Sequence, residues 1–348
     1  MSRTVLLTTG GTIASLPRAG AGVVAAVAGS ELAAVADDGA AVEVVELLRT
    51  GSYAMSLEQV LHVARVAANQ AARPGVGGVV VTHGTDTLEE TAFLCDLLYG
   101  GAAPIVFTGA QRHAGHPMAD GPGNLRDAYA VARHPDARDR GVLVCLGGRA
   151  DRARAAVKRS TVAPAPFAPP GAPAEATVRD GRVRFAMAAA ESGPRHRTPV
   201  LDPAALDPDV LVVTLGVGDD ARLLTAAGAL GARAVIVEAL GLGNANPAVV
   251  AAVGALVAAG VLVGVTSRCA DGPVQPVYGA GGGHDIAAAG ALFLDGLATS
   301  HARVLLMAAL GDGLDPPAVR GLVADFALTH ASGTRPPPAP RPAAGSAR

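Results

Sequence analysis

Two patterns of apolar positions follow one another along the first half of the chain: short continuous runs and stretches with helical spacing. Three short runs rich in Val and Leu predict buried strands, over residues 3–7, 42–47 and 76–82. Apolar residues at helical spacing lie between the last two runs, where Ser56 is a suitable N-cap for a helix over residues 57–73. This alternation predicts a parallel sheet with helices on both of its faces.

The same alternation returns in the second half of the chain. Runs of Val, Ile and Leu predict three further strands, over residues 210–215, 234–238 and 261–266. Stretches of helical spacing separate them, over residues 221–230 and 247–259. Between the two halves, residues 176–185 predict a hairpin around Asp180-Gly181, a strong two-residue turn signal. The second half is therefore expected to form a smaller α/β domain.

These patterns divide the chain into four parts. Residues 1–190 form the larger N-terminal domain, and residues 209–331 form the smaller C-terminal domain. Residues 191–208 are polar and punctuated by Pro, as an interdomain linker should be. Residues 332–348 are rich in Pro and Ala and contain no acid, which predicts a disordered tail.

Composition narrows the class of protein. Half of the 348 residues are hydrophobic, yet no uninterrupted apolar run reaches the ~20 residues that a membrane span needs. A net charge of −2 without a basic cluster argues against a nucleic-acid partner. The chain begins with a strand and a glycine loop rather than a secretion signal, so we expect a cytoplasmic protein. Cys95, Cys145 and Cys269 are scattered and odd in number, which favours buried reduced thiols over a disulfide framework or a metal site.

A glycine pair follows the first predicted strand directly, in Thr9-Gly10-Gly11-Thr12. Glycine accepts positive φ and has no Cβ, so the backbone can turn sharply there and approach a ligand closely. In α/β folds, ligands gather at the carboxyl ends of the strands. Thr12 would place a hydroxyl there beside free backbone N–H groups, which is what nucleophilic attack on a carbonyl requires. Residues 16–29, rich in Gly and Ala, are expected to form a mobile lid.

The third predicted strand ends in a second polar loop, which contains Thr85 and Asp86. Asp86 and Glu89 have the spacing of a capping box for a helix over residues 88–98, so Asp86 is either an ordinary N-cap or a site residue. Two threonine-bearing loops that follow strands of one parallel sheet can converge on one pocket.

The two loops resemble the two signature motifs of the bacterial-type L-asparaginase family. The resemblance lies in Thr9–Ser15 and in His83–Ala92, and it continues through residues 108–112, 120–125, 265–268 and 301–303. It implies that Thr12 is the nucleophile, which attacks a side-chain amide, releases ammonia and leaves an acyl-enzyme for water to hydrolyse. Thr85 and Asp86 match two members of the family's Thr–Lys–Asp group.

Lys158 is the candidate for the lysine of that group. It follows a strand predicted over residues 141–146, and it is the only Lys in the sequence. A threonine hydroxyl is a poor nucleophile unless a base takes its proton. A partly desolvated Lys beside Thr85, oriented by Asp86, can serve in such a relay, whereas Arg cannot readily lose a proton. A solvated surface Lys is the alternative, and the family position argues against it.

The resemblance also implies a set of substrate-binding residues: Gly11, Ser52, Tyr53, Gly84, Thr85, Asp86, Asn246 and Tyr278. Three departures from the family pattern weaken recognition of the amino-acid backbone. Residues 16–39 lack the loop Tyr of many members, and Tyr53 stands where the Gln of a Ser-Gln pair is expected. Residues 272–284 lack the Glu that a neighbouring subunit would contribute, although they contain Tyr278.

The sequence thus predicts a two-domain α/β amidohydrolase that converts L-asparagine to L-aspartate and ammonia without a metal or a cofactor. The resemblance implies a homo-oligomer, a tetramer of paired dimers. The departures leave glutamine or another amide open as the substrate. A non-catalytic ligand-binding member of the fold is the third hypothesis, against which the set Thr12, Thr85, Asp86 and Lys158 argues, because a binder needs neither a nucleophile nor a base.

Overall fold

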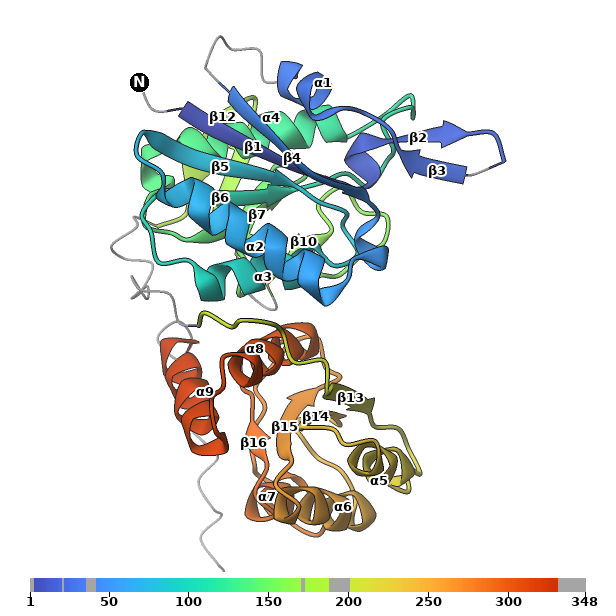
Figure 1. Cartoon of the computed structure of the whole chain (residues 1–348). Helices are drawn as coiled ribbons and strands as arrows, with labels where there is room; N and C mark the ends of the chain where they lie inside the picture. Colours follow the sequence, from blue (N-terminus) through green and yellow to red (C-terminus); the bar gives the residue numbers. More distant parts are fainter. Residues whose placement is uncertain (1–2, 21, 36–41, 170–172, 188–200, 331–348) are drawn as a thin grey trace, which may run out of the picture.

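The computed structural model describes residues 3–20, 22–35, 42–169, 173–187 and 201–330, with side chains as far as residue 324. Figure 1 shows an N-terminal domain above and a C-terminal domain below, with helix α8 at the junction. The predicted tail at 332–348 and most of the predicted linker lie outside the described residues.

An eight-stranded sheet forms the centre of the N-terminal domain, in the order β12-β11-β8-β7-β6-β5-β1-β4. Its strands are β1 (Arg3–Gly10), β4 (Val42–Thr50), β5 (Val76–Thr82), β6 (Ile105–Thr108), β7 (Val142–Leu146), β8 (Arg149–Arg152), β11 (Ala176–Arg179) and β12 (Arg182–Phe185). The five strands from β4 to β7 in this order are parallel, and the remaining three are antiparallel. The sheet is therefore mixed, because Gly147 and Gly148, both with positive φ, close a two-residue hairpin between β7 and β8.

Helices cover both faces of this sheet, as the alternation of patterns predicts (Figure 1). Helices α2 (Leu57–Ala72) and α3 (Leu88–Leu98) pack on one face, and α4 (Gly121–Arg133) and α1 (Gly29–Ala34) pack on the other. Ser56 accepts a hydrogen bond from the Gln59 N–H and caps α2 as expected. The predicted hairpin over 176–185 is confirmed, with positive φ at Asp180 and Gly181.

The short elements of this domain lie in its connections. The region expected to be a lid forms an antiparallel pair, β2 (Ser15–Arg18) and β3 (Gly22–Ala25), followed by α1. A second antiparallel pair consists of β9 (Val157–Lys158) and β10 (Phe167–Ala168). Three short 3-10 helices complete the domain: η1 (Thr12–Ala14), η2 (Ser52–Ala54) and η3 (Pro135–Ala137).

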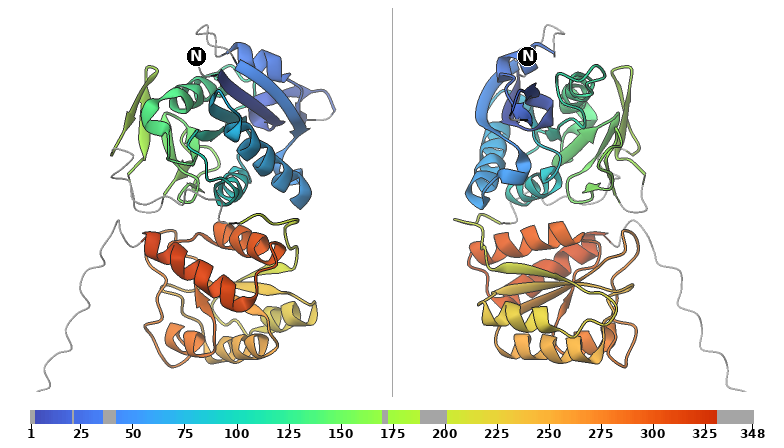
Figure 2. Two further views of the ribbon diagram at one scale, coloured as in Figure 1. Left: turned by 60° about the vertical axis from the view of Figure 1, so that its left-hand side comes forward. Right: turned by 90° about the vertical axis from the view of Figure 1, so that its right-hand side faces the viewer.

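The C-terminal domain is built on a parallel sheet of four strands, in the order β13-β14-β15-β16. The strands are β13 (Val210–Thr214), β14 (Ala234–Ala239), β15 (Leu262–Ser267) and β16 (Leu292–Phe293). Helices on one face are α5 (Arg222–Ala229), α6 (Pro247–Ala258) and α7 (Gly283–Ala288). Those on the other face are α8 (Thr299–Gly311) and α9 (Pro316–His330), and Figure 2 shows the sheet between the two groups.

Helix α8 joins the hydrophobic cores of the two domains. Ala302 and the side chains from Val304 to Leu310 belong to one buried cluster with residues of α3 and of the strands of the C-terminal sheet. Leu201, within the predicted linker, is also buried and donates its N–H to the Leu97 carbonyl. Burial of this kind favours one fixed arrangement of the two domains.

Candidate active site

The loops that follow β1 and β5 are in direct contact at the carboxyl edge of the N-terminal sheet. Gly11 has a φ of 76°, and a Cβ on it would lie 2.5 Å from the Gly84 nitrogen. A Cβ on Gly84 would in turn lie 2.7 Å from the Ser52 hydroxyl oxygen. Any larger residue at Gly11 or Gly84 would push these loops apart, so the glycines are what bring the two threonine-bearing segments together.

Thr12 stands in the first turn after this contact, half-buried in η1. Among the described residues its hydroxyl has no hydrogen-bond partner, which leaves the oxygen available to a substrate. The expectation of free backbone N–H groups beside it is wrong for Gly11. The Gly11 N–H donates to the Thr50 carbonyl, because β4 runs alongside the end of β1.

Lys158 reaches the second loop from β9, although its sequence position is 72 residues away from Asp86. Its Nζ donates to the Thr85 hydroxyl at 3.0 Å and to Asp86 Oδ1 at 2.7 Å. Thr85 is buried, and the side chain of Lys158 is only 17% exposed, whereas that of Asp86 is 58% exposed. The structure therefore assembles the Thr–Lys–Asp group with its carboxylate toward solvent.

Gln111 is a member of this network to which the sequence analysis gave no role. The Thr85 hydroxyl donates to Gln111 Oε1 at 3.2 Å, while its oxygen accepts from Lys158. The Asp120 carboxylate accepts the backbone N–H groups of Gln111 and Arg112 and so holds this loop. Gln111 lies within residues 108–112, where the family resemblance continues. Its role could not be read from that motif, because its contact with the Thr85 hydroxyl forms only in the folded chain.

The capping box expected from Asp86 and Glu89 does not form. Helix α3 has Thr87 as its N-cap, with no side-chain capping bond, because Asp86 is bound to Lys158 instead. The Glu89 carboxylate accepts from the Lys158 N–H and from the Ser300 hydroxyl. Both carboxylates thus have partners that are distant in the sequence, and these long-range contacts replace the local one.

His83 lies directly before the Gly84-Thr85-Asp86 corner and is completely buried. Burial lowers its pKa from 6.5 to about 4, against the opposing effect of its bond to the Gly84 carbonyl. The ring is therefore neutral at physiological pH, and Nδ1–H donates to Gly84 O at 2.8 Å. This bond fixes the carbonyl of Gly84 and with it the backbone that carries Thr85.

The remaining candidates divide between the two domains. Ser52 is buried against the second loop and accepts from the Thr87 hydroxyl and N–H, but neighbouring Tyr53 is 78% exposed. Asn246 caps α6, and Tyr278 lies 57% exposed in the loop before α7. Helices α6 and α7 lie at the end of the C-terminal domain that is farther from the N-terminal domain (Figure 1), and no hydrogen bond among the described residues links Asn246 or Tyr278 to Thr12.

Other expected features have mixed outcomes. Cys95 and Cys145 are buried, and burial raises the pKa of both thiols, but Cys269 is exposed, because it follows the carboxyl end of β15. Within the described residues, no cluster of His, Cys, Asp and Glu side chains is suited to a metal ion, and no helix is long and apolar enough to span a membrane.

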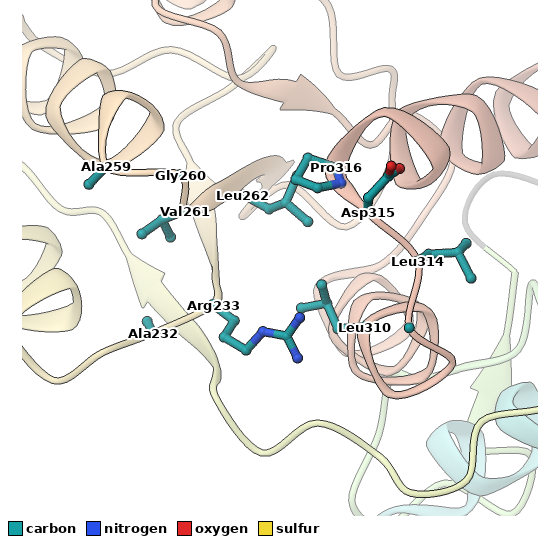
Figure 3. A pocket seen from close by; sticks show the side chains of 11 residues that line it. Ala232, Arg233, Ala259, Gly260, Val261, Leu262, Leu310, Leu314, Asp315 and Pro316 are labelled. Carbon is teal, nitrogen blue, oxygen red and sulfur yellow. The ribbon is translucent and has the colours of Figure 1, made fainter.

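A cavity of about 500 Å³ lies elsewhere, at the amino ends of strands β14 and β15. Its lining includes Leu262, Leu310 and Leu314, and the Arg233 side chain extends toward Leu310 (Figure 3). The Arg233 guanidinium is paired with Asp207. The cavity lining does not include Thr85, Asp86 or Lys158, which lie instead beside the loops after β1 and β5.

Comparison with known proteins shows which family the chain belongs to. Residues 3–191 match the family model described as "Asparaginase, N-terminal", and residues 209–323 match the "Glutaminase/Asparaginase C-terminal domain". The chain is 38% identical over 248 residues to a probable L-asparaginase of Deinococcus radiodurans, a match that covers 71% of this chain and 74% of that protein.

Two further similarities extend this result. A glutaminase-asparaginase of Acinetobacter glutaminasificans is 38% identical over 114 residues, which cover 33% of this chain and 34% of that protein. The crystal structure of a probable cytoplasmic L-asparaginase from Campylobacter jejuni matches with a TM-score of 0.80 and 28% identity, over 93% of this chain and 99% of that one. The chain belongs to the asparaginase family and is an amidohydrolase of the L-asparaginase type.

Proposed function

We propose that the chain hydrolyses the side-chain amide of L-asparagine through an acyl-enzyme on Thr12. One observation carries the proposal: Lys158 Nζ lies 3.0 Å from the Thr85 hydroxyl and 2.7 Å from Asp86, in a loop packed against the one that bears Thr12. A hydroxyl without an internal partner and a polarised Thr–Lys pair are the two parts that nucleophilic catalysis needs.

The reaction would take place in two stages. The Thr12 oxygen attacks the amide carbon, and collapse of the tetrahedral intermediate expels ammonia once the nitrogen has gained a proton. An ester between Thr12 and the aspartyl group remains. Water then attacks the ester, which releases aspartate and returns the proton to Thr12.

Lys158 would manage the proton in both stages. In the described state Nζ donates to Thr85, whose own proton is turned toward Gln111. When Nζ loses a proton to solvent or substrate, the Thr85 hydroxyl can turn from Gln111 and donate to it. Thr85 oxygen then becomes an acceptor for the proton that leaves Thr12, so the lysine acts through the second threonine.

Substrate recognition would use the surface around this group. Asp86 is exposed enough to face the ammonium of an amino acid, and the closely packed Gly11, Gly84 and Ser52 would form the surface next to its loop. Exposed Tyr53 would border the same surface. Glutamine is the second candidate substrate, because a similar protein is a glutaminase-asparaginase.

We further propose that the active form is a cytoplasmic homo-oligomer, with Asn246 and Tyr278 of one subunit completing the site of another. The place of helices α6 and α7 at the far end of the C-terminal domain (Figure 1) and the exposure of Tyr278 support this arrangement. Activity per chain should then fall on dilution below the dimer dissociation constant. Full activity in a monomer verified by sedimentation would contradict this arrangement.

Ammonia release from asparagine and from glutamine tests the function directly. We expect release from asparagine by the unmodified chain and none by the Lys158→Met variant at the same concentration. Release from glutamine alone would replace the proposed substrate. Binding of either amino acid without release of ammonia would instead support the hypothesis of a non-catalytic, ligand-binding member of the fold.

A further inference from the structure

The Glu89 carboxylate lies between the catalytic lysine and the C-terminal domain. It belongs to the first turn of α3 and is 8% exposed. Oε2 accepts the backbone N–H of Lys158, and Oε1 accepts the Ser300 hydroxyl at 2.7 Å. A buried carboxylate with one partner on each oxygen is firmly placed, because bonds to an ionised acceptor are stronger than those between neutral groups.

Ser300 brings the C-terminal domain into this contact. It stands in the first turn of α8, beside Thr299, whose hydroxyl donates to Glu238 Oε1 at 2.8 Å. The same helix turn is therefore bonded to a carboxylate of each domain. Negative charge is favourable at a helix N-terminus, so both carboxylates also stabilise the start of α8.

The lysine needs such a support because its own strand offers little. Strand β9 has two residues, and among the described strands it pairs only with the two residues of β10. A lysine side chain also has four flexible carbon atoms, so the position of Nζ depends on where its backbone is held. The bond from the Lys158 N–H to Glu89 fixes that backbone against the helix that follows Thr85 and Asp86.

We propose that Glu89 is a positioning residue for Lys158, and that Ser300 fixes Glu89 so that docking of the C-terminal domain sets the geometry of the catalytic lysine. The proposal rests on the proposed function, since it concerns the same Lys158. Glu89 touches no reacting atom, and it acts through the lysine backbone alone. Activity should then depend on a hydroxyl of the other domain.

The sequence offers a direct observable for this contact. Because Lys158 is the only lysine, protein made with 15N-labelled lysine has a single lysine backbone N–H signal, and it belongs to the donor that Glu89 accepts. Loss or weakening of that bond moves the signal. If Glu89 served stability alone, its variants would lower the unfolding temperature, and a shift of the Lys158 signal would not be accompanied by a fall in kcat.

Ser300→Ala is the primary variant, and Thr299→Val is its matched control. Each removes one hydroxyl from the same turn of α8, but only Ser300 contacts Glu89. We expect Ser300→Ala to move the Lys158 signal and to lower kcat by about fivefold with KM within about twofold, since small displacements of a catalytic group are costly. Thr299→Val should change neither the signal nor kcat.

Two substitutions at Glu89 complete the test. Glu89→Ala should lower kcat by about 10- to 100-fold. Glu89→Gln should restore most of the activity, because its carbonyl can accept from Lys158 and its amide can donate to the Ser300 oxygen. An unchanged kcat in Ser300→Ala and Glu89→Ala, or a fall in kcat with an unmoved Lys158 signal, would overturn the positioning role. An active Lys158→Met variant would instead overturn the proposed function.

Discussion

The two domains end their parallel strands in similar polar residues but use them in opposite ways. At the carboxyl edge of the C-terminal sheet, Thr214 and Thr299 both donate to Glu238, and the Thr266 and Thr299 hydroxyls are 2.9 Å apart. At the corresponding edge of the N-terminal sheet, the Thr12 hydroxyl has no hydrogen-bond partner among the described residues, and Asp86 faces solvent.

This difference indicates that the C-terminal cluster is structural, whereas the N-terminal cluster is available to a ligand. The C-terminal groups satisfy one another, so replacing them removes bonds that stabilise the fold. The N-terminal groups leave an oxygen and a carboxylate for a ligand, so replacing them should change turnover and leave stability almost intact. Five predictions test the comparison, from the largest expected effect to the smallest.

Thr12→Ala and Lys158→Met should each lower kcat/KM by about 10³-fold or more, because both remove parts of the proposed proton-transfer unit. The double variant should be hardly worse than either single one, since groups that act together do not contribute additively. Steady-state ammonia release measures all three. The unfolding temperature of Thr12→Ala should equal that of the unmodified chain.

Lys158→Arg sharpens this result, because Arg keeps the positive charge for Asp86 but cannot accept a proton at neutral pH. We expect a folded and nearly inactive protein. An active Lys158→Arg variant would show that the lysine contributes charge alone, and that another group is the base.

His83 should make stability depend on pH. Its pKa of about 4 in the folded protein lies below the ordinary 6.5, so its contribution is complete above pH 6.5 and is lost as the pH falls toward 4. The free energy of unfolding should fall by about 3 kcal/mol over this range from His83 alone. His83→Asn, which can still donate to Gly84, should show a flatter dependence in urea unfolding, and an equally steep one would contradict the assignment.

Asp86→Ala should reduce kcat and raise KM together, each by about tenfold, because it removes both an orienting partner of Lys158 and the ground-state contact proposed for the substrate amine. Asp86→Asn keeps the shape and serves as the control for charge. If KM stays constant while kcat falls, the amine of the substrate is held by another group.

Glu238→Ala should have the opposite profile. It leaves the Thr214 and Thr299 hydroxyls without their acceptor, which should lower the free energy of unfolding by about 1–2 kcal/mol. The kcat for asparagine should stay within about twofold, since no bond of this cluster reaches Lys158. If Glu238→Ala lost activity while its stability stayed unchanged, the C-terminal cluster would not be purely structural, and the proposed difference between the two sheet edges would be wrong.

Sequence patterns predicted the parts of this architecture that depend on local information. A few neighbouring residues determine each of these features: the apolar strand runs, the Ser56 cap and the turn at Asp180-Gly181. The antiparallel turn from β7 into β8 was missed, because Gly147-Gly148 follows a run that looks like any other buried strand. Chain reversal there depends on a pair of glycines that the pattern of apolar residues does not distinguish.

The candidate site shows the same limit more sharply. Asp86 and Glu89 have the spacing of a capping box, but the fold supplies Lys158 and Ser300, 69 and 211 residues from Glu89, as stronger partners. A local pattern cannot anticipate such competition. The choice of Lys158 rested on its chemistry and on the family resemblance, and the fold brings it within hydrogen-bonding distance of Thr85.

The distribution of basic side chains has a consequence for chemical modification. Lys158 is the only side-chain primary amine in the 348 residues, and every other member of the Lys and Arg set is Arg. Acylating reagents that label many positions on most proteins would find one lysine here, next to Thr85 and Asp86. Attachment of a carrier through lysine would therefore consume the group proposed for proton transfer, whereas the exposed thiol of Cys269 offers attachment away from it.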